Sequence, residues 1–89
     1  MTIRQLEYFC ATAEEGSVSA AARKLHVAQP PVSRQIALLE EELGVILLDR
    51  SKKPVIPTEA GAVVIAQAQE TLKAYNTIRE SVAELKGET

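Results

Sequence analysis

The 89-residue sequence contains one cysteine and one histidine, and this scarcity limits its chemistry. The single cysteine, Cys10, excludes a disulfide within the chain. Its place beside an apolar helical stripe favours a small buried hydrophobic residue, with a redox-sensing thiol as the alternative. His26 falls in a predicted tight turn, where it either caps a helix or touches a phosphate. Without a second histidine or a cysteine cluster, we expect no metal site and no cofactor.

Aromatic residues and long apolar runs are also scarce. There is one Phe, there are two Tyr and no Trp, so aliphatic residues and alanines must form the core. No run approaches the roughly 18 consecutive apolar residues of a membrane span. The first nine residues lack the basic and apolar regions of a secretory signal. We therefore expect a cytoplasmic protein without membrane contact, small enough for oligomerisation to help its stability.

Residues 17–44 predict two helices joined by a very short turn. Ser17 is suited to cap the first helix, because its hydroxyl can accept a hydrogen bond from a free backbone N–H. The apolar residues of segment 18–25 fall at helical spacing, and its alanines allow a second helix to approach closely. The turn is predicted at residues 26–28, with Val27 packed in the core between the two helices.

The second helix is predicted to begin at two prolines, because a proline in the first turn of a helix removes no hydrogen bond. Its apolar residues repeat every three or four positions from Val32 to Leu43, so one face is buried. Polar and basic residues stand at its start, largely off that face. This arrangement favours a helix-turn-helix that enters the DNA major groove, and an ordinary pair of helices is the alternative. The candidate DNA-contacting residues at this helix start are Gln29, Ser33 and Arg34.

The formal net charge of −2 is unusual for a nucleic-acid-binding domain, but the charges are unevenly distributed. Residues 16–35 carry three cations and no acid, and residues 50–57 carry three more and no acid. The acids concentrate in other segments. This distribution predicts a localised DNA-binding face rather than a general polycation.

Residues 45–57 predict a two-stranded wing. The apolar run 45–48 and the extended segment 55–57 flank a basic turn, from which Lys52 and Lys53 can reach the minor groove or the DNA backbone. An ordinary solvated loop is the alternative.

From Thr58 to Gly87 the sequence predicts one long helix, capped by Thr58. Its apolar residues follow a seven-residue pattern suited to pairing with another helix. The small winged domain is too short to cover such a helix, so we expect a homodimer. Ile65 and Leu72 fall beside the pairing face and are expected to face the protein's own core. The predicted pairing residues are Val64, Ala68, Thr71, Tyr75, Ile78, Val82 and Leu85.

The longest motif in the chain reads AARKLHVAQPPVSRQI, continues with LEEELGV and is followed by PTEAG. It resembles the DNA-binding domain of LysR-type bacterial transcriptional regulators, with the similarity running from about Ile3 to Gly61. The remainder is similar to the linker helix of that family. The Q-P-P-x-S-R core together with Lys53-Pro54-Val55 is most similar to members that control the degradation of aromatic compounds.

This resemblance implies a mainly α-helical winged helix-turn-helix that binds a double-stranded operator as a dimer. It implies phosphate contacts from Ser17, Thr58 and Arg4, and wing contacts from Lys52 and Lys53. The residues that it implies to meet bases or adjacent backbone in the major groove are Gln29, Pro30, Pro31, Ser33 and Arg34. In the family the linker helices pair antiparallel. Many relatives have serine at the position of Ala28, whose side chain cannot donate to a phosphate. Full-length members continue into an effector-binding domain, absent from this chain, so a small-molecule inducer is expected only for the full-length protein.

The expected division is a winged helix-turn-helix at residues 1–57 and a linker or dimerisation helix at residues 58–89. We expect no enzyme, because no nucleophile is paired with a base and most carboxylates lie in exposed helical runs. The alternative function is a helical adaptor that binds other proteins through its C-terminal helix. If the protein were an adaptor, the polar residues near Gln29 and the basic wing would have no common role.

Overall fold

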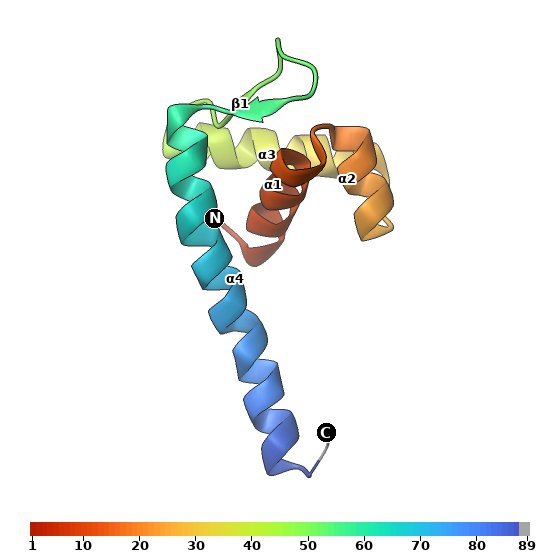
Figure 1. Ribbon diagram of the computed structural model, residues 1–89, viewed down its shortest axis with the longest axis vertical. Coiled ribbons are helices and arrows are strands. Elements are labelled where there is room, and N and C mark those ends of the chain that lie inside the picture. Colours follow the sequence, from red (N-terminus) through yellow and green to blue (C-terminus); the bar gives the residue numbers. More distant parts are fainter. Residues whose placement is uncertain (88–89) are drawn as a thin grey trace.

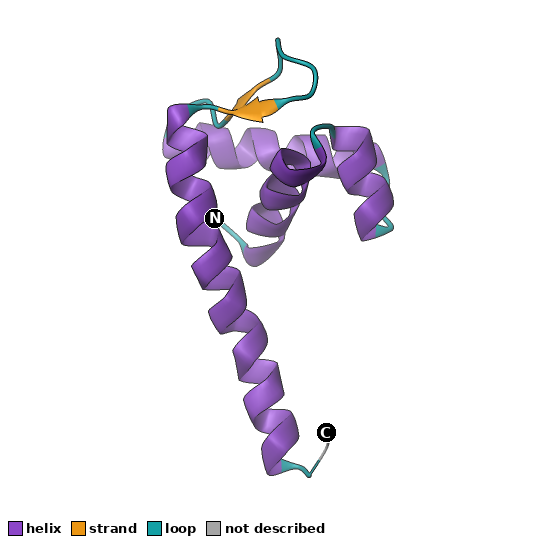
Figure 2. Ribbon diagram, in the orientation of Figure 1, coloured by secondary structure: helices purple, strands orange, loops and turns teal. Residues whose placement is uncertain are grey.

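Three of the four helices within residues 1–87 begin at a residue whose side chain caps them, and three end at a residue in a left-handed backbone conformation. The computed structural model describes residues 1–87, so Glu88 and Thr89 of the expected segment 58–89 lie outside the described residues. The mainly helical fold with a two-stranded wing is the predicted one (Figures 1 and 2). Its elements are α1 (Ile3–Glu15), α2 (Val18–Leu25), α3 (Gln29–Leu43), β1 (Leu48–Asp49), β2 (Ile56–Pro57) and α4 (Glu59–Leu85).

The predicted caps are confirmed at both ends of the helix-turn-helix. The hydroxyl of Ser17 accepts a hydrogen bond from the amide of Ala20 at 3.0 Å. Gly16 and Gly44 have φ angles of +81° and +72°, which end α1 and α3 without the steric cost of a side chain. His26 ends α2 in the same left-handed region, with a φ of 59°, so it serves here as a C-cap.

The core lies where α1, α2 and α3 meet the segment before β1. The predicted apolar faces of these helices are buried in it, and the alanines of α2 allow close packing as expected. Leu43 is an exception, because it is 37% exposed at the end of the predicted face of α3. The fully buried side chains include Phe9, Ala21, Val32, Ile36, Leu39, Leu47 and Leu48.

The turn between α2 and α3 lies where it was predicted, but the prediction that Val27 packs in the core is wrong. Val27 is 37% exposed. Its amide donates to the carbonyl of Ala22 at 3.0 Å, so the backbone rather than side-chain packing holds the turn. A β-branched residue in a short turn therefore gives no sign of burial here.

Replacing Val27 with Asp should therefore change the free energy of unfolding by less than about 1 kcal/mol, as for most surface substitutions. The matched control is Val32→Asp, because Val32 is 0% exposed and a charge placed there has no water. That control should lose several kcal/mol, on the order of 3 or more. Thermal melting followed by circular dichroism compares the two. Equal losses in both variants would show that Val27 is part of the core.

Helix α4 begins beside the wing, passes α1 and then extends beyond the rest of the molecule (Figure 1). The principal dimensions of the protein are 49 × 24 × 19 Å. Ile65 and Leu72 are partly buried against the core, as expected. Ala68 differs from its expected place on the pairing face, because it is 2% exposed within its own chain and has almost no surface left for a partner. Val64 is likewise half-buried against the same core.

None of the helices within residues 1–87 is both long enough and apolar enough to cross a lipid bilayer.

Candidate nucleic-acid interface

The start of α3 presents polar side chains to solvent. Gln29 and Arg34 are exposed and Ser33 is half-buried. Ala28 occupies the N-cap and makes no side-chain cap, so no side chain competes for the positive end of the helix dipole. Pro30 and Pro31 carry no backbone N–H, so this first turn offers DNA its exposed side chains rather than a set of free amides.

Two of the six cations in the acid-free segments are engaged within the chain. Lys24 Nζ donates to Glu14 Oε1 at 2.7 Å and lies 3.4 Å from Glu15 Oε2. The hydrogen bonds that Lys24 donates to Glu14 and then to Glu15 raise its pKa. Arg50 Nη2 lies 3.8 Å from Glu40 Oε1.

The remaining four cations form no ion pair among residues 1–87. The positive charge available to DNA is therefore smaller than the sequence pattern suggests, because acids of α1 pair with Lys24 of α2 and an acid of α3 lies near Arg50. These free cations are Arg23, Arg34, Lys52 and Lys53.

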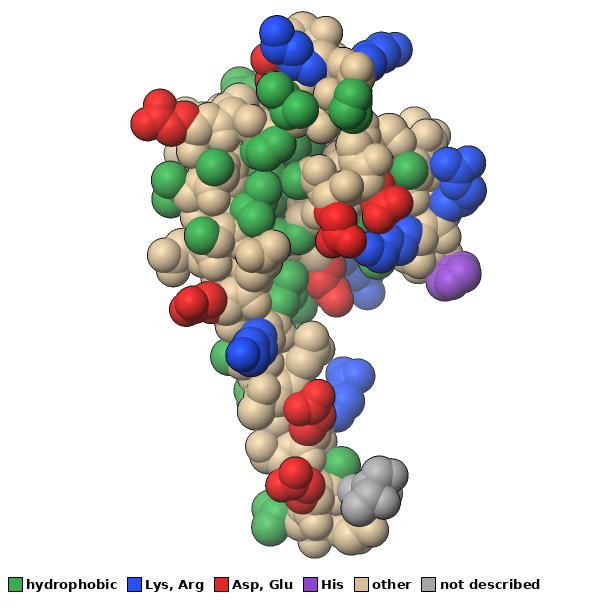
Figure 3. All heavy atoms as spheres, in the orientation of Figure 1, with side chains coloured by type: hydrophobic (Ala, Val, Ile, Leu, Met, Phe, Trp, Pro, Cys, Tyr) green, Lys and Arg blue, Asp and Glu red, His purple; other side chains and the backbone are tan. Residues whose placement is uncertain are grey.

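The wing is a two-residue antiparallel ladder that pairs Leu48 with Pro57 and Asp49 with Ile56. Asp49 Oδ1 accepts hydrogen bonds from the amide and the hydroxyl of Ser51, which shapes the turn after β1. These bonds, the side-chain one first, lower the pKa of Asp49. Figure 3 shows basic side chains gathered over the wing, where Lys52 and Lys53 are exposed.

The return strand of the wing is tied to the turn between α1 and α2. The amide of Val55 donates to the carbonyl of Gly16 at 2.8 Å. A Cβ on Gly16 would lie 2.7 Å from Cβ of Pro54, so the wing approaches this turn too closely for any side chain. Ser17, the predicted phosphate contact, therefore stands next to an attachment point of the wing.

The outgoing strand of the wing is tied to α3 through Glu40, one of the acids outside the two basic segments. Its Oε2 accepts from the amides of Leu47 at 2.8 Å and Leu48 at 3.3 Å. A signal for this role existed in the sequence, because Glu40 follows Ile36 by four residues and so lies on the apolar face of the helix. A carboxylate at such a position needs partners inside the protein.

Ser17 and Thr58, both predicted phosphate contacts, differ in their available donors. The hydroxyl of Ser17 accepts from Ala20 and lies 3.4 Å from that of Ser19, so it can still donate outward. The hydroxyl of Thr58 donates to the carbonyl of Ile46 at 2.6 Å, and its amide donates to the carbonyl of Leu47 at 3.0 Å. Both donors of Thr58 are thus used within the chain, and the structure makes it part of the joint between the wing and α4 instead.

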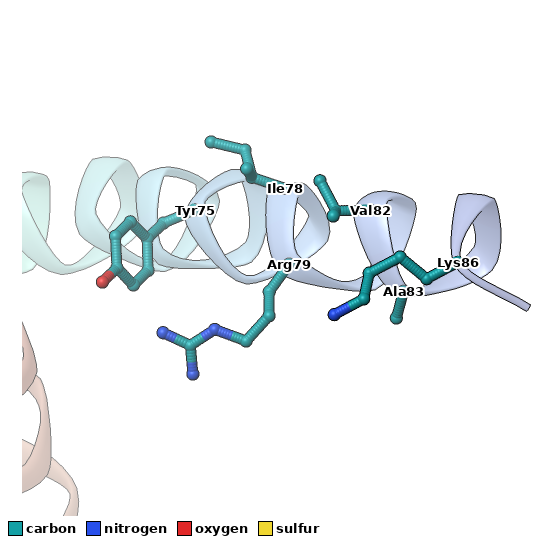
Figure 4. Close-up of a pocket in the computed structure, with 6 residues that line it drawn as sticks. All are labelled: Tyr75, Ile78, Arg79, Val82, Ala83 and Lys86. Atoms are coloured by element: carbon teal, nitrogen blue, oxygen red, sulfur yellow. The ribbon is translucent and has the colours of Figure 1, made fainter. Parts of the chain in front are cut away.

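The outer half of α4 carries the exposed part of the predicted pairing face. Ile78 and Val82 are 66% and 50% exposed, and both project from one side of the helix (Figure 4). Arg79 and Lys86 project from the other side. Thr71, Tyr75 and Leu85 are exposed as well. The predicted DNA-contacting elements, α3 and the wing, lie at the opposite end of the molecule from this face (Figure 1).

Other reactive groups are few. Within the described chain no group of three or more His, Cys, Asp or Glu residues is arranged to hold a metal ion. Cys10 is partly buried against the core. Burial, and secondarily the carboxylate of Glu14, raises the pKa of its thiol, which disfavours the reactive thiolate.

The chain is similar to known proteins along almost its whole length. Residues 3–62 match the family described as "Bacterial regulatory helix-turn-helix protein, lysR family". The HTH-type transcriptional regulator TfdS of Cupriavidus pinatubonensis is 51% identical over 89 residues, which are 99% of this chain and 30% of the relative. The DNA-binding transcriptional dual regulator OxyR of Escherichia coli is 44% identical over 100% of this chain and 29% of its own length. The chain thus spans about 30% of the length of these relatives.

Two solved structures of DNA complexes have the same fold. The structure described as "BenM_DBD/catB site 1 DNA Complex" superposes with a TM-score of 0.90 at 42% identity, covering 98% of this chain and 95% of that one. The "CbnR_DBD-DNA complex" superposes with a TM-score of 0.84 at 44% identity, covering 96% and 99%.

Proposed function

The chain belongs to the lysR family of bacterial regulatory helix-turn-helix proteins, and from this premise we propose that it binds a specific double-stranded DNA operator as a homodimer. The start of α3 reads bases in the major groove, and the wing contacts the neighbouring minor groove or backbone. Because bacterial operator DNA lies in the cytoplasm, this function implies a cytoplasmic protein.

One observation carries this proposal. Four exposed cations without ion pairs belong to the helix-turn-helix and the wing, together with the exposed Gln29 and the half-buried Ser33. Cations position a protein on phosphates, whereas an amide such as that of Gln29 can pair with adenine in the major groove. In this assignment Gln29, Pro30, Pro31, Ser33 and Arg34 meet bases or adjacent backbone. Ser17, Arg4, Lys52 and Lys53 meet phosphates or the minor groove.

The homodimer forms through the exposed outer half of α4. A face of Tyr75, Ile78, Val82 and Leu85 is left exposed by the rest of residues 1–87, and a second copy offers the same face in return. A dimer also places two recognition helices on two half-sites of one operator. Thr71 contributes at the inner end of this face, while Val64 and Ala68 support it from the core.

The division into a DNA-binding unit at residues 1–57 and a dimerisation helix at residues 58–89 follows the same logic. The relatives are about three times longer, and a whole regulator of this kind adds an effector-binding domain that responds to a small molecule. The chain itself acts by binding, not by catalysis, and needs no cofactor. A protein-binding adaptor is the alternative, and it would not shift a DNA duplex in a gel.

The division of work between helix and wing can be measured on two duplexes. One is the duplex that the parent chain selects from a random-sequence pool, and the other is a scrambled version of it. Gln29→Ala should cost about 1–3 kcal/mol on the selected duplex and little on the scrambled one, because base contacts carry sequence discrimination. Lys53→Ala should weaken both nearly equally and lower the salt slope by about one unit per lost phosphate contact.

Lys73→Ala is the control for the lysine, because it removes the same charge from an exposed position on α4. It should leave binding to both duplexes close to that of the parent. If Lys53→Ala lost only the selected duplex while Gln29→Ala lost both alike, the wing would read the sequence and the helix would hold the backbone.

A further inference from the structure

Glu40 lies in the last turn of α3, and its side chain is 12% exposed. Its neighbours behave differently, because Glu41 is exposed and Glu42 pairs with the N-terminal amine of Met1. Of three consecutive glutamates, only the first turns toward the wing.

The carboxylate of Glu40 holds the backbone where the chain enters β1. Leu47 and Leu48 are 0% and 1% exposed, so their amides need acceptors inside the protein. Glu40 Oε2 accepts from both, at 2.8 and 3.3 Å. Its other oxygen lies 3.8 Å from Arg50, the residue that follows β1. One side chain of the recognition helix thus contacts the beginning and the end of the outgoing strand.

We propose that Glu40 is a positioning residue for DNA recognition, which sets the wing tip at a fixed distance and angle from the start of α3. This inference rests on the proposed function, in which Gln29 on α3 and Lys52 and Lys53 on the wing contact one duplex together. Glu40 and Gln29 are eleven residues apart on one helix, or about 16 Å at roughly 1.5 Å per residue. A rigid helix therefore connects the base-reading end to the attachment of the wing.

The second attachment of the wing makes this role separable from folding. The bond from the amide of Val55 to the carbonyl of Gly16 does not involve Glu40, so we expect it to persist in a variant without this side chain. Loss of Glu40 leaves the amides of Leu47 and Leu48 without this acceptor, which loosens the entry to β1. The bonds from Thr58 to Ile46 and Leu47 do not involve Glu40 and still hold the segment to α4. The wing remains attached, but its lysines no longer have a fixed position relative to α3.

The test compares Glu40→Ala with Glu41→Ala, since both remove one carboxylate from the same stretch of α3. Removing an acid close to DNA raises affinity by simple electrostatics, so Glu41→Ala should bind the selected duplex as tightly as the parent or slightly tighter. Glu40→Ala should instead lose about tenfold in affinity, equivalent to one lost contact of about 1.4 kcal/mol, and show a smaller salt slope. Glu40→Gln keeps an oxygen for the two amides and should stay within about threefold of the parent.

A double-mutant cycle separates positioning from general stability. In a Lys52→Ala, Lys53→Ala background, Glu40→Ala should change affinity by less than about twofold, because the groups that it positions are gone. A purely structural role predicts the same loss in both backgrounds. If Glu40→Ala does not fold at the assay temperature, the cycle is run with Glu40→Asp, which keeps the charge but is too short to reach both amides.

Additive losses in the cycle, or parent-like binding by Glu40→Ala, would overturn the role of Glu40 and leave the proposed function intact. A parent chain that enriches no duplex from the random pool would overturn the proposed function, and this inference with it.

Discussion

Replacing Gly61 with alanine is expected to lower the free energy of unfolding by more than about 3 kcal/mol, although alanine is the better helix former by about 1 kcal/mol. Gly61 lies in the first turn of α4, where the backbone after α3 passes very close. An added Cβ would overlap the carbonyl oxygen of Leu47 and lie 3.0 Å from its carbonyl carbon and 3.1 Å from Cβ of Pro57. Most of these atoms belong to the backbone and cannot move aside without opening the joint. Thermal and urea unfolding measure the loss.

Gly44→Ala is the comparison that isolates steric overlap. No atom lies within 4 Å of a Cβ added there, but the φ of +72° is unfavourable for alanine. This variant should lose only about 1–2 kcal/mol, the cost of one residue in the left-handed region. A Gly61→Ala protein as stable as the parent, or more stable, would show that α4 does not approach Leu47 in this way.

Replacing both Ile78 and Val82 with Asp should convert the dimer to monomers and reduce operator affinity by about a hundredfold or more, because the second half-site is no longer bound at high effective concentration. Both side chains are exposed in the single chain, so the monomer should keep its melting temperature. In the dimer the same positions would bury up to four unpaired carboxylates, which is strongly unfavourable. Light scattering measures the mass and a gel shift measures the affinity.

The control is Thr77→Asp with Ser81→Asp, which adds the same charges at the same spacing on an adjacent face of α4. It should remain dimeric and bind DNA with a modest loss from the added negative charge. An unchanged dimer in the Ile78, Val82 variant would move the interface to another surface. Equal dissociation in both variants would indicate that charge alone, rather than this face, decides assembly.

Local patterns predicted the fold well, because caps, turns and apolar periodicity act over a few residues. Ser17 as a cap, the prolines at the start of α3 and the wing after Gly44 needed no knowledge of distant partners. The free cations of the candidate DNA interface were identified in the same way. The sequence overstated their number at two positions, because Lys24 pairs with Glu14 and Glu15 of α1 and Arg50 lies 3.8 Å from Glu40 Oε1.

Features that depend on distant segments were harder to predict. The seven-residue pattern of α4 indicates which face is buried but not what buries it, so Ala68 was assigned to a partner although its own core covers it. Val27 was assigned to the core because it is apolar, although the turn exposes it. The hydroxyl of Thr58 donates to Ile46, twelve residues away, and Glu40 meets amides seven and eight residues away. Such contacts form only once α3, the wing and α4 have packed.

The joint at Thr58 makes α4 and the winged domain move together as one rigid unit. Only this residue separates β2 from α4, and its hydroxyl and the closely packed Gly61 leave the helix no room to pivot. The 27-residue helix is about 40 Å long at roughly 1.5 Å per residue. A tilt of about 10° at its paired end therefore displaces the DNA-contacting end by about 7 Å, the rise of about two base pairs. In the proposed dimer, small changes in how two such helices cross would therefore alter the spacing between the half-sites by whole base-pair steps.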